Sequence, residues 1–196
     1  MVNPACSAAD ASSQTVTADV TTWYLELRQP QDLRGRPAPL ADLAVLRAEA
    51  PSPEFGRFLY TAVGGDWYWS DRLAWDDACW QQRLSKPGVE TWVVYQAGTP
   101  AGYFELEAPG DGSVEIAYFG LLPAFIGNGI GGYLLTVAVQ RAWTLGASRV
   151  WLHTCSLDGP HALANYQARG FRIYHQETAP RTLLVPVPAP GPWSSD

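Results

Sequence analysis

The feature that most constrains the fold is the stretch 115–145, which reads EIAYFGLLPAFIGNGIGGYLLTVAVQRAWTL. An apolar run from Ile116 to Leu122 ends at Pro123, and a glycine-dense loop from Gly127 to Gly132 leads into apolar residues at helical spacing. This pattern predicts a strand, a loop and an amphipathic helix. The first amides of a helix lack internal partners, its dipole places positive charge there, and glycine lets an anion approach the backbone. We therefore interpret the stretch as a diphosphate cradle.

Two known nucleotide-binding motifs must be compared with this glycine-rich loop. Gly127-x-Gly129-x-x-Gly132 satisfies the dinucleotide fingerprint formally. In that motif, however, the glycines follow the strand directly, and an acidic residue about 20 positions on binds the ribose. Here Pro123 to Ile126 intervene, and the next expected strand (149–154) carries no acid. A nucleotide P-loop is excluded because no Gly-Lys-Ser/Thr follows the loop.

Two motifs resemble those of the GNAT-type, acetyl-CoA-dependent N-acetyltransferase superfamily. The segment 126–131, IGNGIG, resembles the family's acetyl-CoA loop, Arg/Gln-x-x-Gly-x-Gly/Ala, with Ile126 in place of the long polar residue. The segment 162–171, ALANYQARGF, resembles Ala-x-x-x-Tyr-x-x-x-Gly-Phe, although Gly159 stands where the family usually has an asparagine. The resemblance spans residues 15–187. Several segments are also similar to a little-characterised bacterial branch of the superfamily.

The resemblance implies an α/β (α+β) GNAT fold: a mixed central sheet of about six to seven strands with helices on both faces. We expect one domain over 15–187, with a flexible N-terminus over 1–14 and a loose C-terminal tail over 188–196. Strands are expected at 15–27, 89–96, 102–107, 116–122, 149–154, 171–177 and 182–187, and helices within 39–84 (from Leu40 through Leu43, Ala44 and Arg47, at 54–62 and at 71–84), after 132 and after Pro160.

The resemblance also implies acetyl-CoA as the acetyl donor. Backbone N–H groups near Gly120 to Leu122 would stabilise the oxyanion that forms when the thioester is attacked. The residues expected to bind the cofactor are Leu121, Leu122, Ile126, Gly127, Asn128, Gly129, Ile130, Gly131 and Gly132.

Amine acetylation needs a base, because an alkylammonium with a pKa near 10 is only about 0.1% neutral at pH 7, a penalty of roughly 4 kcal/mol. Glu115 matches the position at which some family members hold their general base. Two alternatives stay open: Glu115 is an exposed strand-end carboxylate, or Glu105 on the preceding strand serves instead.

Tyr166 lies at the position of the family's general acid, where its phenol would protonate the leaving thiolate. The alternative is an aromatic residue packed on the sheet. His153 would flank the pantetheine slot, and we favour a hydrogen-bonded structural histidine over a proton relay. Direct transfer is more economical than an acyl-Cys155 intermediate, and no metal is expected.

Composition restricts the partners. A net charge of −6 argues against nucleic acid and mildly favours a cationic acceptor. No span for a membrane and no signal peptide are visible, and three scattered cysteines form no disulfide framework, which favours a cytoplasmic location. A homodimer is compatible with the sequence. Aromatic residues between 55 and 80, interleaved with aspartates, would form either the core or a cation-binding acceptor wall.

The sequence thus favours an N-acetyltransferase that moves an acetyl group from acetyl-CoA directly to a primary amine of a small molecule, peptide or protein. The alternative is a non-catalytic acyl-CoA-binding module, and a dinucleotide-dependent oxidoreductase is the third hypothesis. The acceptor itself is not encoded in any recognisable motif, because similar cores serve many acceptors.

Overall fold

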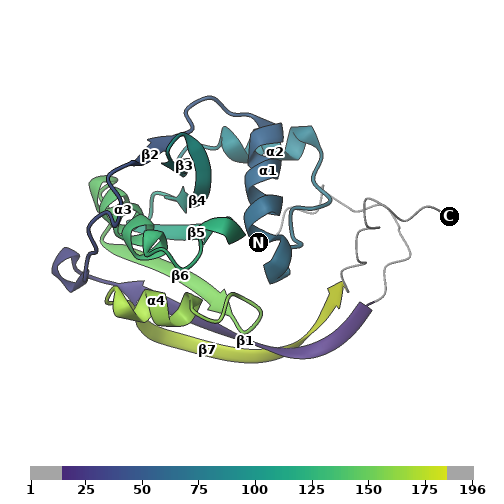
Figure 1. Ribbon diagram of the computed structural model, residues 1–196. Helices are drawn as coiled ribbons and strands as arrows, with labels where there is room; N and C mark the ends of the chain where they lie inside the picture. The colour runs from purple at the N-terminus through teal and green to yellow at the C-terminus, as the bar shows by residue number, and fades with distance from the viewer. Residues whose placement is uncertain (1–14, 185–196) are drawn as a thin grey trace.

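A mixed seven-stranded sheet with helices on both faces organises the chain, as the sequence predicts (Figure 1). The computed structural model describes residues 15–184, so the predicted tails and residues 185–187 lie outside it. Its strands, in the spatial order β2-β3-β4-β5-β6-β1-β7, are β1 (Thr15–Leu27), β2 (Leu43–Arg47), β3 (Val89–Gln96), β4 (Thr99–Glu107), β5 (Ser113–Leu121), β6 (Arg149–Cys155) and β7 (Arg172–Leu184). Its helices are α1 (Pro53–Gly64), α2 (Asp77–Leu84), α3 (Ile130–Thr144) and α4 (Ala162–Ala168), with short 3-10 turns η1 (Pro30–Asp32), η2 (Gly65–Trp67) and η3 (Pro123–Phe125).

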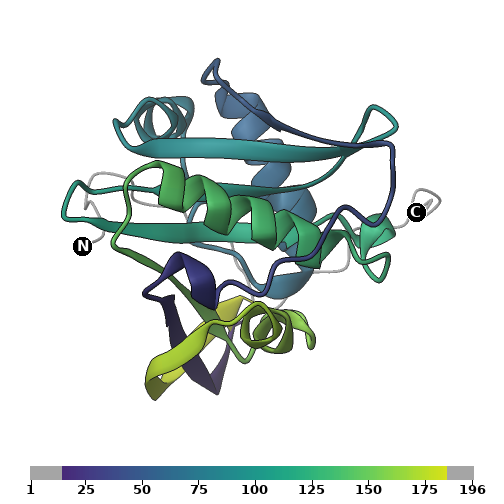
Figure 2. The ribbon, with the colours of Figure 1, turned by 90° about the vertical axis from the view of Figure 1, so that its left-hand side faces the viewer.

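Helix α3 packs across one face of the sheet, and α1 with α2 covers the other (Figures 1 and 2). Leu135, Ala138 and Ala142 are fully buried, as their spacing predicts, in a core that also holds Val114 and Leu152. A smaller cluster on the opposite face joins Leu59 and Val63 of α1 to Val93 and Tyr103 of the sheet. The two faces therefore have separate apolar cores, with the sheet between them.

The sheet opens between β5 and β6. These strands pair in parallel only from Ser113↔Arg149 to Glu115↔Trp151. Beyond Glu115, β5 keeps its partner β4 but has no strand partner on its other side within residues 15–184. Because unpaired backbone groups at the middle of a sheet need partners, this opening is a natural place for an extended ligand.

Residues 43–47 form strand β2, and the prediction of a helix there was wrong. Val45 pairs with Val94 of β3, and Leu43 and Val45 pack toward the core while Ala44 and Leu46 between and after them are exposed. Leu43, Ala44 and Arg47 are also compatible with helical spacing, so the short run is ambiguous in the sequence. Pairing with β3 decides the outcome, because tertiary contacts override weak local propensity.

Two further boundaries differ from the prediction. Helix α2 begins at Asp77, not Asp71, because the Asp76 side chain accepts a hydrogen bond from the Cys79 amide at 2.8 Å and caps the helix there. The two closing strands expected over 171–177 and 182–187 are one strand, β7, which pairs antiparallel with β1. Pro180 interrupts nothing because β7 is an edge strand, where proline is tolerated.

Candidate active site

The N-terminus of α3 presents bare backbone amides, as the glycine loop predicts. Gly127 and Gly129 have φ angles of +91° and +79°, which only glycine adopts readily. Gly129 is the N-cap, and no side chain accepts a hydrogen bond from the first turn. Ile126 is 45% exposed and offers no polar atom to a ligand. The loop and first turn are therefore shaped to receive an anion at the backbone.

Of the amides expected near the oxyanion, that of Leu122 is already engaged. It donates to the carbonyl of Ala101 at 2.9 Å. Because backbone donors alternate in direction along a strand, the amide of Leu121 points the opposite way, toward the opening beside β5. The candidate oxyanion donor on this segment is therefore Leu121.

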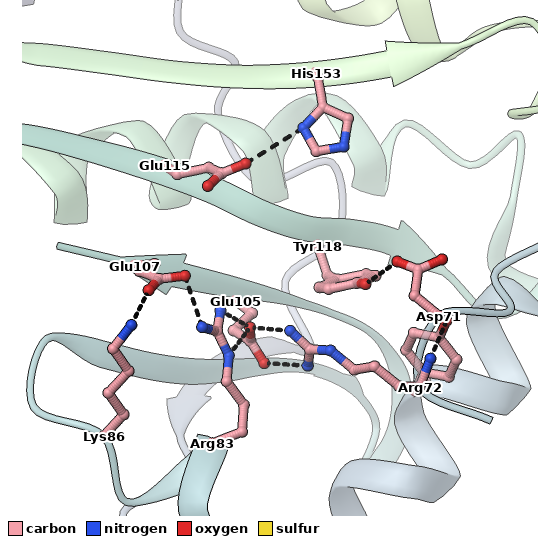
Figure 3. A network of polar contacts seen from close by, with 10 residues as sticks. Asp71, Arg72, Arg83, Lys86, Glu105, Glu107, Glu115, Tyr118 and His153 are labelled. Carbon is pink, nitrogen blue, oxygen red and sulfur yellow. Dashed lines mark hydrogen bonds and ion pairs between the residues drawn. The ribbon is translucent and has the colours of Figure 1, made fainter. Parts of the chain in front are cut away.

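Glu115 and His153 meet where the pairing of β5 with β6 ends and the opening begins (Figure 3). The Nδ1 atom of His153 lies 3.3 Å from a carboxylate oxygen of Glu115. Their neighbours Val114, Ile116 and Leu152 belong to the core on the α3 side, so alternation places Glu115 and His153 on the α1/α2 face. The His153 side chain is 49% exposed and that of Glu115 19%.

Carboxylates and aromatic rings surround His153. The hydrogen bond to Glu115 raises the pKa of His153 above 6.5, and although burial opposes this, the charges of Glu115, Asp158 and Asp71 add to the increase. Asp71 accepts a hydrogen bond from the Tyr118 hydroxyl at 2.8 Å (Figure 3), and the ring centroid of Tyr24 lies 5.9 Å from that of His153. This environment favours a cation.

Glu105 is excluded as the base. It is 2% exposed and forms a two-fold hydrogen bond with Arg72, at 2.9 and 2.8 Å (Figure 3). Arg83 donates to the same carboxylate at 3.0 and 2.5 Å. Burial alone would raise the pKa of Glu105, but the two arginines more than offset it and the pKa is lowered. Glu105 is a structural anion that binds α2 and the preceding loop to β4.

Tyr166 projects from α4 toward the other side of the opening. Its ring is 7% exposed and packs edge-on against Phe119 of β5 and Phe171, with centroids 6.0 and 6.2 Å apart. Burial, with a smaller contribution from Asp158, raises its pKa. Within residues 15–184 the hydroxyl has no hydrogen-bond partner, so it is free to donate to a ligand.

The geometry does not favour covalent catalysis by Cys155. Burial, with the charge of Asp158, raises the pKa of the free Cys155 thiol, which makes it a poorer nucleophile. Residues 15–184 contain no group of three or more His, Cys, Asp or Glu side chains placed to hold a metal ion.

The aromatic residues between 55 and 80 divide between core and surface, because Phe58 and Tyr68 are 46% and 41% exposed. Trp80 and Tyr60 are each 1% exposed, and Trp69 packs edge-on against Tyr118 with centroids 4.9 Å apart. Trp67 reaches the loop after β6, 3.5 Å from where a Cβ on Gly159 would lie. This contact joins the α1/α2 cover to the β6–α4 loop, next to His153.

Sequence reasoning gave too little weight to one residue of the site and missed another. His153 was considered as a relay but not as the partner of Glu115, which only the parallel register of β5 and β6 brings close. Arg169 belongs to the Tyr-x-x-x-Gly-Phe segment in the sequence, and it is the C-cap of α4, about one helical turn after Tyr166. It lies beside the first turn of α3.

The fold and this opened sheet define an acyltransferase-type architecture. Residues 53–171 match the Acetyltransferase (GNAT) family, and the chain belongs to that family. Comparison with curated proteins finds no match.

Solved structures resemble the chain over most of its length. A GCN5-related N-acetyltransferase from Kribbella flavida is 22% identical, with a TM-score of 0.58 over 87% of this chain and 60% of its own. An aminoglycoside acetyltransferase from an uncultured soil metagenomic sample is 17% identical (TM-score 0.56, 65% of this chain, 87% of its own). An IAA acetyltransferase from Bacillus cereus is 27% identical (TM-score 0.51, 68% of this chain, 79% of its own). The chain thus spans 60% of the length of the Kribbella flavida relative. None of the helices within residues 15–184 has the length and apolar character that crossing a membrane requires.

Proposed function

We propose that the chain is an acetyl-CoA-dependent N-acetyltransferase that acts on a cationic primary amine by direct transfer within a ternary complex. The observation that carries this proposal is the opening between β5 and β6, with bare amides at the head of α3 on one side and the Glu115–His153 pair on the other. The coenzyme would lie along the α3 side, held at its diphosphate by the amides of residues 127–132. The acetyl carbonyl would then point to the Leu121 amide.

The acceptor would approach from the α1/α2 face. There Glu115, Asp71 and Asp158 surround His153 with negative charge, and aromatic rings line the same region. An ammonium group is attracted by both features. Because only the neutral amine attacks, a base must then remove its proton. We assign that step to Nε2 of His153, with Glu115 holding Nδ1 and fixing the tautomer.

Tyr166 would act on the leaving group. Its pKa is raised above 10 by burial, whereas an ordinary thiol has a pKa of about 8.5. Complete proton transfer from this phenol to a thiolate is therefore uphill, and its main contribution would be a hydrogen bond that stabilises the thiolate as the C–S bond breaks. We therefore propose Tyr166 mainly as a hydrogen-bond donor to the thiolate, and only secondarily as the general acid that the sequence predicts.

Replacing Tyr166 by Phe should lower kcat by roughly 10- to 100-fold, the value of one hydrogen bond to a charged group. The ring packing against Phe119 and Phe171 is retained, so the thermal midpoint of the free protein should change little. Steady-state thiol release at saturating acetyl-CoA measures the effect. Unchanged turnover near neutral pH would remove Tyr166 from the mechanism.

The proposed function is tested by binding followed by turnover. Acetyl-CoA at 100 times its Kd should add about 2.7 kcal/mol to stability, or roughly 5–10 °C in Tm for a domain of this size, whereas NADH should add nothing. Thiol release should then follow with cationic acceptors, such as a polyamine, an aminoglycoside or a lysine peptide, and be much slower with an amine beside a carboxylate. Binding without release for every amine would identify a non-catalytic acyl-CoA-binding module instead.

A further inference from the structure

The segment between β1 and β2 carries Arg36 to the head of α3. Figure 2 shows this segment running alongside α3 toward its N-terminal end. The amide of Arg36 donates to the Thr136 hydroxyl at 2.9 Å, and that hydroxyl donates to the Gly132 carbonyl at 2.8 Å. The amide of Arg34 donates to the carbonyl of Arg169 at 3.0 Å. These bonds fix the segment to α3 and to α4 at once.

A second arginine, Arg169 at the end of α4, reaches the same point. A Cβ built on Gly132 would lie 2.7 Å from Nη1 of Arg169 and 3.4 Å from Cγ of Arg36. Gly132 is the third residue of α3, so the guanidinium of Arg169 lies against the helical turn whose amides are bare. A side chain at this position would therefore have to displace the guanidinium of Arg169.

Neither arginine has a counter-ion among residues 15–184. Arg169 is 8% exposed, and its Nε is buried without a hydrogen-bond partner. Within residues 15–184, no carboxylate forms an ion pair with Arg36 or Arg169, whereas Arg72, Arg83, Arg141 and Arg149 are all paired. Burial and the charge of Arg36 lower the pKa of Arg169. A buried guanidinium beside a second one is costly unless an anion joins them.

We infer that Arg169 and Arg36, together with the bare amides of α3, form the binding site for the diphosphate of the acyl donor, in place of the polar side chain that Ile126 does not provide. This inference rests on the proposed function for the identity of the donor, but its physical content is a diphosphate site. Arginine suits the role because its planar donors match phosphate oxygens. We assign the site to the diphosphate and not to the 3′-phosphate because the Arg169 guanidinium lies at the first turn of α3. The amides of that turn and the guanidinium could then bind the same phosphate group.

The test compares Arg169→Met, which keeps the aliphatic stem, with Arg57→Met, a matched loss of one positive charge on α1, where Arg57 pairs with Asp77 on the surface. Calorimetry with CoA, dephospho-CoA and pantetheine should show Arg169→Met weakening the first two by the same factor, about 10- to 100-fold. Pantetheine, which lacks phosphate, should bind the wild type and both variants alike. Arg57→Met should bind all three ligands as the wild type does, and Arg169→Lys should recover part of the lost affinity.

A merely structural arginine would give a different result. Because Arg169 lies beside Arg36 without a counter-ion, Arg169→Met should leave the Tm of the free protein unchanged or higher, and a clear fall would contradict the inference. Gly132→Ala, which displaces Nη1 without removing the charge, should also weaken CoA and dephospho-CoA binding. If Arg169→Met does not fold, the affinities of Gly132→Ala for CoA and dephospho-CoA test the inference instead.

Two other outcomes separate this inference from the proposed function. If the wild type binds CoA and Arg169→Met binds it equally well, the arginine site is wrong and the proposed function stands. If Arg169→Met loses affinity for CoA but not for dephospho-CoA, the arginine holds the 3′-phosphate and the diphosphate assignment is wrong. If the wild type does not bind CoA, the proposed function fails, and thermal stabilisation by inorganic pyrophosphate then tests the anion site. Stabilisation of the wild type but not of Arg169→Met supports the site. An equal change in Tm for both proteins overturns it.

Discussion

Replacing Glu105 by Gln should destabilise the protein by roughly 3–5 kcal/mol, because it leaves two guanidinium groups without their shared anion in a buried site. The carboxylate is 2% exposed and receives hydrogen bonds from both Arg72 and Arg83. Arg72 cannot turn outward to solvent, since it lies over the ring of Tyr118 at 4.1 Å and beside Trp75 at 4.8 Å. At 2–4 °C per kcal/mol, we expect a fall in Tm of roughly 6–20 °C.

Glu107→Gln is the matched control. Glu107 lies two residues away on β4 and pairs with Arg83 and Lys86, but its side chain is 21% exposed and that of Lys86 is 51% exposed. Water can replace its bonds, so the cost should be about 1 kcal/mol or less. Chemical denaturation of both variants at pH 7 measures the difference. Equal losses would show that burial of the Glu105 pair contributes nothing special.

The ion pairs of Glu105 with Arg72 and Arg83 also make the stability of the protein depend on pH, in a direction that can be stated. The folded-state pKa of Glu105 is lowered, so its contribution to stability is fully present above the ordinary glutamate pKa of about 4.3. The contribution is lost as the pH falls from there through the folded-state pKa. Wild-type stability should therefore drop more steeply in acid than that of Glu105→Gln, which has no proton to take up at this position.

The sequence was most informative where local rules decide the structure. Gly127, Gly129 and the apolar spacing of α3 act within a few residues of one another, so the loop and helix were predicted correctly. Strand β2 and the placement of β1 between β6 and β7 depend on partners far away in the chain. No short-range pattern carries that information, because a strand's neighbours are set by tertiary pairing.

The candidate site shows the same division. Tyr166 and the cradle glycines belong to local motifs and could be selected from the sequence, although their roles remain proposals. The partnership of Glu115 with His153, 38 positions apart in sequence number, appears only once β5 and β6 lie parallel. Glu105 is the alternative to Glu115 that the sequence leaves open, and burial beside Arg72 sets it apart from Glu115.

His153→Gln should reduce kcat/KM by about 10²- to 10⁴-fold, the usual range for a general base, with little change in Kd for acetyl-CoA. The reason is positional: Nε2 is the free ring nitrogen on the acceptor face, whereas Nδ1 faces Glu115. The half-exposed side chain makes a large loss of stability unexpected. With an acceptor amine whose pKa is low enough that it is already neutral at the assay pH, the variant should regain much of the lost rate, because such an acceptor needs no base. A loss that is the same for amines of every pKa would assign His153 to binding rather than to proton transfer.

The pH profile then distinguishes His153 from Glu115 as the group that takes the proton. The pKa of His153 is raised above 6.5, chiefly by its hydrogen bond to Glu115, and a protonated imidazole cannot act as a base. Activity should therefore rise with pH through that raised pKa. Glu115→Gln removes the main cause, so the rising limb should move to lower pH, toward 6.5, while the maximal rate falls because the tautomer is no longer fixed. If Glu115 itself were the base, Glu115→Gln would instead abolish the limb and leave no titration near neutrality. The direction in which the limb moves thus decides which of the two side chains accepts the proton.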